Sequence, residues 1–167
     1  MNLNEIVPDF RLPDLHGVVH RLDDLRGRIV IVNFWSAECP HSERTDQVLM
    51  AALHDWADEV ALLAIASNAS ETPETIRRVA DARRLPLVLH DGDQIVAELF
   101  AAEMTPHVFV IDQVGVLRYR GAVDDVSFAQ RAPTRSFVSD AVERLRAGRM
   151  PDIQETAAYG CAIVRRF

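Results

Sequence analysis

The chain has 167 residues and a formal net charge of −7, and 49% of its residues are hydrophobic. This length and composition favour one folded domain with a single core. We expect that domain to span residues 1–167, with an N-terminal hairpin over 6–25 and a C-terminal tail over 151–167. The acidic balance argues against nucleic acid as a partner. No apolar stretch approaches the roughly 20 residues of a membrane span, so we expect no membrane partner either.

The first residues, MNLNEIVPDF, lack the basic and apolar regions of a signal peptide. This favours a cytoplasmic protein, although a trimmed exported chain would read in the same way. Only two cysteines are present, Cys39 and Cys161. Two cysteines do not make a disulfide framework, so they indicate either chance or one redox pair.

The first half of the chain predicts a hairpin followed by a βαβ unit. Two short extended patches, Phe10 to Leu12 and Val18 to Leu22, flank turn residues at 14–17 and predict a hairpin on the edge of the main sheet. The continuous apolar runs Ile29 to Trp35 and Val60 to Ala66 are typical of strands buried on both faces. The helix expected between them makes a βαβ unit with a right-handed crossover.

The second half predicts shorter elements and a final helix. Thr72 and Pro73 are typical of a helix start, and Gly148 of a helix end. The fold class is therefore α/β, with a central mixed sheet flanked by helices. The tail has no clear period, but Ala162 to Val164 is apolar enough to dock. The expected elements are a helix from 73 to about Arg84, a strand over 87–90, a helix over 94–101, an antiparallel hairpin of 108–112 and 116–120, and a helix opened by Thr134.

Cys39 is the leading candidate for chemistry. Pro40 suits the first position of a helix, which places Cys39 at the helix N-terminus. Backbone N–H groups and the helix dipole there stabilise a thiolate. His41 would add positive charge when protonated, whereas Glu38 opposes the shift. The alternative is a buried, inert cysteine.

Two segments, NFWSAECPHS from Asn33 to Ser42 and MTPHVFVIDQVG from Met104 to Gly115, carry a family likeness. They resemble the thioredoxin superfamily, and specifically its redoxin group of alkyl hydroperoxide reductase and thiol-specific antioxidant type. NFWSAECPHS resembles the family's strand, loop and helix start, and Cys39 falls on the nucleophilic cysteine. MTPHVFVIDQVG resembles the family's cis-proline loop, which implies a cis bond between Thr105 and Pro106. The resemblance implies a thioredoxin-like fold in which the backbone of this loop receives an extended substrate peptide.

A closer resemblance lies further along the chain. YRGAVDD, starting at Tyr119, and YGCAIVR, starting at Tyr159, are similar to a peroxiredoxin-like subgroup that ends in a Gly-Cys motif. Cys161 falls on that cysteine. Ser42 stands where thioredoxins have a second cysteine, and Ser36 where many members of the subgroup have one. The resemblance therefore makes Cys161 the candidate resolving thiol, with a small packed residue under the tail as the alternative.

Several further residues are expected to support the site. Trp35 would pack beside it, and Ser36 and Ser42 would either donate a hydrogen bond to the thiolate or cap the helix. Asn33 stands where thioredoxins bury a carboxylate. The acidic pair at 124 and 125 is expected to be solvated.

The resemblance implies a thiol-disulfide oxidoreductase that acts through Cys39. The alternatives are a thiol peroxidase and a non-catalytic module that binds extended peptides. Substrates would be protein or small-molecule disulfides or hydroperoxides, with a thiol as reductant and a monomer or homodimer as the assembly. We expect no cofactor and no metal, because the spacing of Cys39 and His41 matches no recognised metal site.

Overall fold

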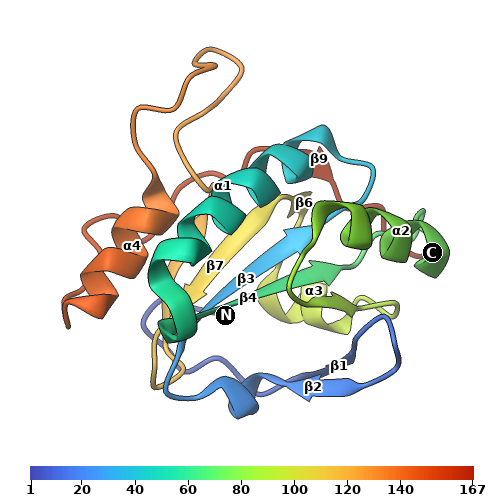
Figure 1. Cartoon of the computed structure of the whole chain (residues 1–167), viewed down its shortest axis with the longest axis horizontal. Helices are drawn as coiled ribbons and strands as arrows, with labels where there is room; N and C mark the ends of the chain where they lie inside the picture. Colours follow the sequence, from blue (N-terminus) through green and yellow to red (C-terminus); the bar gives the residue numbers. More distant parts are fainter.

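The computed structural model describes residues 1–167, and a five-stranded mixed sheet lies at its centre (Figure 1). The strand order is β5-β4-β3-β7-β8; β3, β4 and β5 are parallel, and β7 and β8 run antiparallel to their neighbours. This confirms the predicted βαβ unit and the antiparallel hairpin. The strands are β3 (Ile29–Trp35), β4 (Val60–Ala66), β5 (Val88–His90), β7 (His107–Ile111) and β8 (Leu117–Gly121).

Four α-helices cover the two faces of this sheet. The helices α1, α2 and α4 pack on one face, and α3 packs on the other together with the N-terminal segment. The predicted α/β fold with helices on both faces is confirmed. The helices are α1 (Pro40–Trp56), α2 (Pro73–Arg83), α3 (Ile95–Phe100) and α4 (Phe137–Arg146), with short 3-10 helices η1 (Leu22–Leu25) and η2 (Ala57–Glu59).

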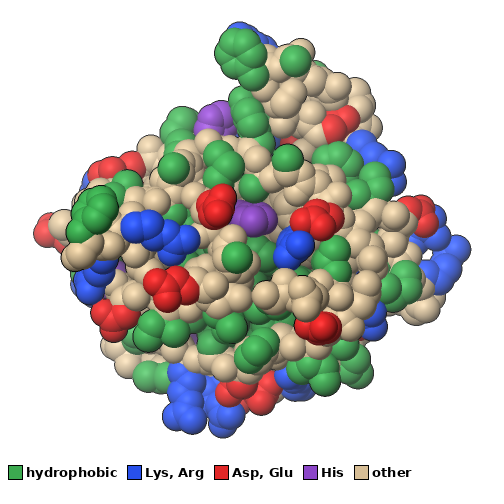
Figure 2. Space-filling view, turned by 180° about the vertical axis from the view of Figure 1, so that it is seen from behind, with side chains coloured by type: hydrophobic (Ala, Val, Ile, Leu, Met, Phe, Trp, Pro, Cys, Tyr) green, Lys and Arg blue, Asp and Glu red, His purple; other side chains and the backbone are tan.

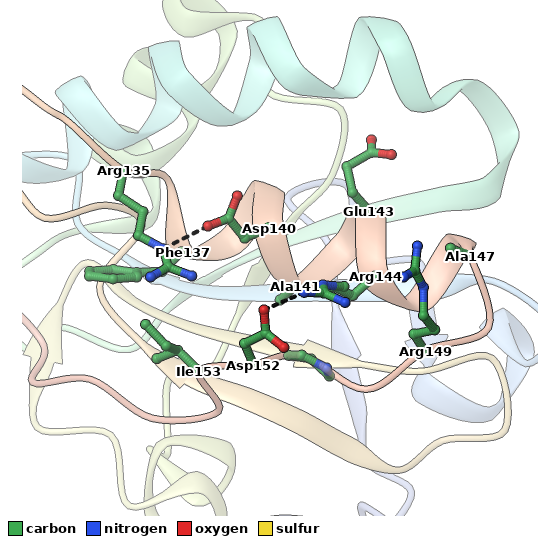
Figure 3. A pocket seen from close by; sticks show the side chains of 11 residues that line it. Arg135, Phe137, Asp140, Ala141, Glu143, Arg144, Ala147, Arg149, Asp152 and Ile153 are labelled. Atoms are coloured by element: carbon green, nitrogen blue, oxygen red, sulfur yellow. Dashed lines mark hydrogen bonds and ion pairs between the residues drawn. The ribbon is translucent and has the colours of Figure 1, made fainter.

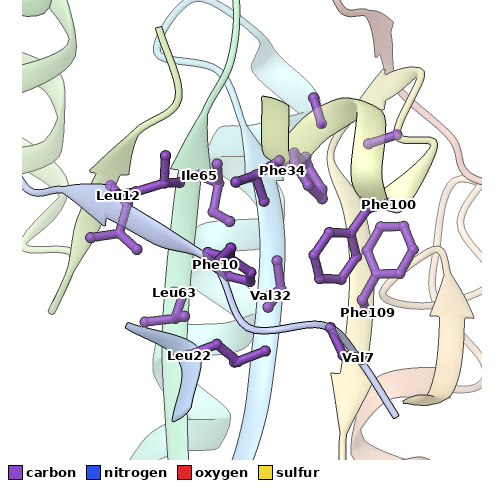
Figure 4. Close-up of a cluster of buried hydrophobic side chains, with 14 of the residues drawn as sticks. Val7, Phe10, Leu12, Leu22, Val32, Phe34, Leu63, Ile65, Phe100 and Phe109 are labelled. Atoms are coloured by element: carbon purple, nitrogen blue, oxygen red, sulfur yellow. The ribbon is translucent and has the colours of Figure 1, made fainter. Parts of the chain in front are cut away.

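All seven residues of β3 are buried, so the strand contributes side chains to both faces. Ile29 and Ile31 face α1 and α4, whereas Val32 and Phe34 point into the opposite cluster. Figure 4 shows that second cluster, in which the ring of Phe34 lies 5.5 Å from that of Phe100 in an edge-to-face arrangement. Burial on both faces holds β3 at the centre of the sheet and so anchors the short segment that leads from it to α1.

The N-terminal hairpin forms, but as a sheet of its own. Its strands β1 (Arg11–Pro13) and β2 (Val19–Arg21) pair only with each other, and a single bridge from Asp14 to Leu89 touches the edge strand β5. Phe10 and Leu12 bury their side chains in the core. The hairpin is therefore held by side-chain packing rather than by a continuous ladder.

The start of the last helix was predicted wrongly. Ser136, not Thr134, is the N-cap of α4, and its side chain accepts a hydrogen bond from the N–H of Ser139. The hydroxyl of Thr134 instead donates to Asp125. Both residue types cap helices, and the loop contact decides between them.

The C-terminal tail docks, as expected, and does so as a strand. Two short strands, β6 (Met104–Thr105) and β9 (Cys161–Ala162), pair antiparallel in a separate two-stranded sheet. Ile163, just beyond them, is 6% exposed and belongs to the core. None of the helices combines the length and the apolar character that crossing a bilayer requires. The rear face of the molecule carries acidic and basic side chains side by side (Figure 2).

Candidate active site

Cys39 lies between the end of β3 and the first residue of α1. It is the N-cap of α1, with extended backbone angles (φ −86°, ψ 120°), and Pro40 takes the first helical position. The Cys39 carbonyl accepts the backbone N–H of Ser42 at 3.1 Å and that of Glu43 at 3.2 Å. The residue is 3% exposed. Its sulfur therefore sits at the positive end of the α1 dipole, out of bulk water.

The loop before β7 lies against this cysteine. The peptide bond between Thr105 and Pro106 is cis, as the resemblance implied. The Cys39 thiol donates a hydrogen bond to the carbonyl oxygen of Thr105, with the two atoms 3.2 Å apart. The structure thus brings together three residues named from the sequence, across more than sixty positions of chain.

Cys161, in the C-terminal tail, also lies next to Thr105. In the β6–β9 pair, Cys161 stands directly opposite Thr105, and Ala162 opposite Met104. The Cys161 thiol and its backbone N–H both lower the pKa of the Cys39 thiol, which places Cys161 beside the Cys39 sulfur. The two cysteines are free thiols in this structure, and Cys39 is the more deeply buried.

The pKa of the Cys39 thiol is lowered from its ordinary value. Burial raises it, because a thiolate is poorly solvated inside the protein. The Cys161 thiol, and the backbone N–H groups of Ser42 and His41, together lower it by more, because donor groups near the sulfur favour its charged form. The contact to the Thr105 carbonyl uses the thiol proton and so belongs to the protonated form.

The pKa of the Cys161 thiol moves the other way, to about 11. Burial is the largest cause; the hydrogen bond to Cys39 and the negative charge of a Cys39 thiolate add to it. The pair therefore loses its first proton from Cys39, while Cys161 stays protonated and donates to the resulting anion.

Ser36 does not donate to Cys39. Its hydroxyl donates to Glu71, which is 6% exposed and also accepts the backbone N–H of Glu38 at 3.1 Å. The hydroxyl of Ser42 accepts the backbone N–H of Ser36 at 3.2 Å. Of the two roles left open for these serines, a hydroxyl donor to the sulfur is therefore not the one that the structure shows.

A small cleft is lined by His41 and Pro106, which lie on the two segments that meet at Cys39. The ring of Tyr159, from the tail, packs edge-on to the His41 ring at 4.9 Å and closes one side. The remaining free space is about 20 Å³, enough for one water molecule.

Asp124 forms part of the same cleft and corrects the expectation of a solvated acid. It is 4% exposed and pairs with Arg44 of α1. Sequence reasoning missed this ion pair because the two partners are 80 positions apart. The neighbouring Asp125 is in the loop that follows, where it accepts the backbone N–H of Thr134 at 2.8 Å.

Trp35 takes part in a hydrogen-bond network that fixes the loop before Cys39. Its indole N–H donates to Asp46 at 2.7 Å, and Asp46 also accepts from Arg83 at 3.0 Å. Arg83 in turn donates to the carbonyl of Ala37 at 3.0 Å, in the loop that leads to Cys39. This network fixes the loop between β3 and α1. Asn33 is buried, and its side-chain oxygen has no hydrogen-bond partner.

Neither cysteine lines the larger hollows of the surface. The groove in Figure 3 runs along α4 and the segment after it, with about 560 Å³ of free space. Its arginines at 135 and 144 pair with Asp140 and Asp152, so its charges are largely compensated. No group of three or more histidine, cysteine or acidic side chains is arranged to hold a metal ion.

A sheet of this order, a buried cysteine at a helix N-terminus and a cis-proline facing it define a thioredoxin-like protein. The chain belongs to the AhpC/TSA family, whose model matches residues 3–120. The thioredoxin domain of a thiol-disulfide oxidoreductase from Bacteroides vulgatus shares the fold, with a TM-score of 0.65, 17% identity and coverage of 78% of this chain and 93% of that chain.

Two further comparisons differ in how much of the chain they cover. The thiol-disulfide oxidoreductase ResA of Geobacillus thermodenitrificans is 32% identical over 113 residues, which cover 66% of this chain and 64% of the relative. The match thus spans just under two thirds of that relative. A solved structure of an uncharacterized conserved protein from Geobacillus kaustophilus has a TM-score of 0.90 at 26% identity and covers 99% of this chain and 93% of that chain. The tail with Cys161 lies outside the family match and within this structural match.

Proposed function

We propose that this protein is a thiol-disulfide oxidoreductase in which Cys39 is the nucleophile and Cys161 the resolving thiol. The observation that carries the proposal is the placement of Cys161 opposite Thr105, the residue whose carbonyl oxygen contacts the Cys39 sulfur. The similarity to ResA supports the same activity.

The Cys39 thiolate attacks one sulfur of a disulfide, forming a mixed disulfide and releasing the first thiolate. The Cys161 thiol then gives up its proton, and its sulfur attacks that of Cys39. The second thiolate leaves, and a bond joins the two cysteines. The substrate has gained two electrons and the protein has lost them; a thiol reductant reverses the change in the protein.

The pKa values of the two thiols set the order of these steps. Two causes of the high pKa of Cys161 are the hydrogen bond to Cys39 and the negative charge on Cys39. Both disappear once Cys39 is part of a mixed disulfide. The pKa of Cys161 then falls, so the resolving thiol is activated only after the first step.

The experiment is to treat the reduced protein with an excess of an aromatic disulfide and to count the released thiolates. Wild-type protein should release two thiolates and keep no adduct. Cys161→Ser should release one and keep the adduct on Cys39, and Cys39→Ser should react slowly. A stable adduct on wild-type Cys39 would refute the resolving role.

The same sample also separates the two alternatives. Consumption of hydrogen peroxide that outpaces disulfide reduction would favour a peroxidase. If Cys39 is alkylated no faster at neutral pH than a free thiol with a pKa of about 8.5, a non-catalytic module is favoured.

A further inference from the structure

The edge of β6 that faces the cysteines is occupied by the chain's own tail. Thr105 pairs with Cys161 and Met104 with Ala162, and the N–H of Ile163 donates to the carbonyl of Glu103 at 2.9 Å. The backbone hydrogen-bonding groups of residues 103–105 on this edge are therefore already paired with an antiparallel strand of the same molecule. No second strand can pair at this edge while the tail is in place.

Gly160 lets the tail lie this close. A Cβ atom built on Gly160 would overlap the carbonyl oxygen of Thr105 and would lie 2.8 Å from Cδ of Pro106. Both neighbours belong to a buried loop, so they cannot move aside as the end of a flexible side chain could. Only glycine permits this contact.

The covering segment is fixed at both ends. Upstream, the Thr156 hydroxyl bonds to the hydroxyl of Tyr119 at 2.7 Å and accepts the N–H of Ala122 at 3.0 Å. Downstream, Ile163 is buried in the core, and the N–H of Val164 donates to Asn68 at 2.7 Å. The six residues 157–162 between these contacts therefore cross the site as a segment that is fixed at both ends.

This arrangement treats large and small disulfides differently. A disulfide within a polypeptide normally approaches a strand edge by adding a strand of its own, and here that edge is taken. A small disulfide needs no strand edge. The cleft lined by His41, Pro106 and Tyr159 lies next to the residues that flank Cys39, and an outward turn of the Tyr159 side chain would widen it without breaking the backbone pairs of β6 and β9.

We infer that the tail makes this site selective for low-molecular-weight disulfides over disulfides in extended polypeptides, and that Gly160 is the specificity-determining residue. This inference rests on the proposed function. In this exchange a small disulfide takes two electrons and two protons from Cys39 and Cys161 and leaves as two thiols, while the two cysteines become a disulfide.

The test compares two probes with the same reacting bond. One is the mixed disulfide of cysteine and 2-mercaptoethanol, and the other carries that disulfide at the centre of a short extended peptide. Second-order rates are measured on the reduced full chain by acid quenching and mass spectrometry. Wild-type protein should favour the small probe by about tenfold or more, because the peptide must first displace backbone pairs.

Gly160→Ala should bring the ratio of the two rates close to one, because a displaced tail frees the β6 edge for the peptide. The loss of Cys161 from the side of Cys39 slows both probes alike and cancels in the ratio. Ala162→Ser, in the same strand with an exposed side chain, is the matched control and should keep the wild-type ratio. Amide exchange at Ile163 should become faster in Gly160→Ala only.

Equal rates of the two probes on wild-type protein would overturn the inference and leave the proposed function standing. An unchanged ratio in a folded Gly160→Ala with rapid Ile163 exchange would overturn it as well. If Gly160→Ala does not fold, the wild-type ratio decides. If neither probe oxidises the wild-type protein, the proposed function fails, and the inference with it.

Discussion

Cys161 stands opposite Thr105 in an antiparallel strand pair, and the carbonyl oxygen of the same Thr105 lies 3.2 Å from the sulfur of Cys39. One residue of β6 thus contacts both cysteines, which are 122 positions apart in the sequence. The tail pairing therefore presents the second thiol to the first without a Cys-X-X-Cys motif.

Removing the Cys161 thiol should raise the pKa of Cys39. In Cys161→Ala the sulfur loses a side-chain donor to its charged form, and only backbone donors remain. The midpoint of the pH–rate profile for alkylation of Cys39 should move upward, with a loss of about tenfold in rate at pH 7. Cys161→Ser restores a hydroxyl donor, so its midpoint should return toward that of the wild type. Identical midpoints in all three proteins would contradict the account.

Removing the Cys39 thiol should lower the pKa of Cys161. In Cys39→Ala the hydrogen bond and the charge that raise this pKa are absent, and only burial remains. Titration of the Cys161 thiol by its ultraviolet absorbance should therefore give a midpoint clearly below the wild-type value of about 11. A midpoint that stays at the wild-type value would mean that the two thiols do not interact.

Asp46 should make stability fall as pH rises. Burial, the largest cause, raises its pKa from 3.8 to about 6, although Trp35 and Arg83 hold it down. The folded state then binds a proton more tightly than the unfolded state, so the favourable contribution is present below about pH 4 and is lost as pH rises through 6. Relative to Asp46→Asn, wild-type protein should lose about 2 to 3 kcal/mol of unfolding free energy across this window.

Denaturant unfolding at several pH values measures this loss. Asp55→Asn is the control, because Asp55 is exposed on the same helix. A difference between wild type and Asp46→Asn that stays constant with pH would show that Asp46 does not titrate in this range.

His107 should make stability fall as pH drops. Burial lowers its pKa from 6.5 to about 4, with a smaller contribution in the same direction from Arg120. The folded state then resists protonation, so the stability is full above about pH 6.5 and declines as pH falls toward 4. Over that pH interval the free energy of unfolding of His107→Gln should fall by about 3 kcal/mol less than that of the wild type. The same series of denaturant unfolding experiments measures this difference. A parallel decline in both proteins would contradict the prediction.

Patterns among neighbouring residues in the sequence predicted the central strands and the helix start at Cys39. They did not predict which distant segments pair with each other. The buried run from Ile29 to Trp35 and the proline after Cys39 fix β3, the helix start and the thiol from adjacent residues alone. The strands β6 and β9 have two residues each, too few for a period, and they meet only because the chain folds. Gly160 was the available signal, since a glycine before Cys161 indicates a close backbone approach.

Side-chain partners were equally hidden. Ser36 looked like a donor to the sulfur because the two are close in sequence, but Glu71 competes for its hydroxyl from 35 positions away. Asp124 looked solvated because acidic residues in a loop after a strand usually face water, whereas Arg44 reaches it from α1, 80 positions away in the sequence. Sequence spacing ranks candidates for a site, and the tertiary contacts decide which of them touch.

The most direct test of the Cys39–Cys161 pair is peptide mapping of dilute, reduced wild-type protein after oxidation with one equivalent of a small disulfide. We expect a monomer that has lost two hydrogens and yields one cross-linked peptide containing Cys39 and Cys161. A lasting mixed disulfide on Cys39 with a free Cys161 thiol, or a dimer linked through Cys39, would contradict it.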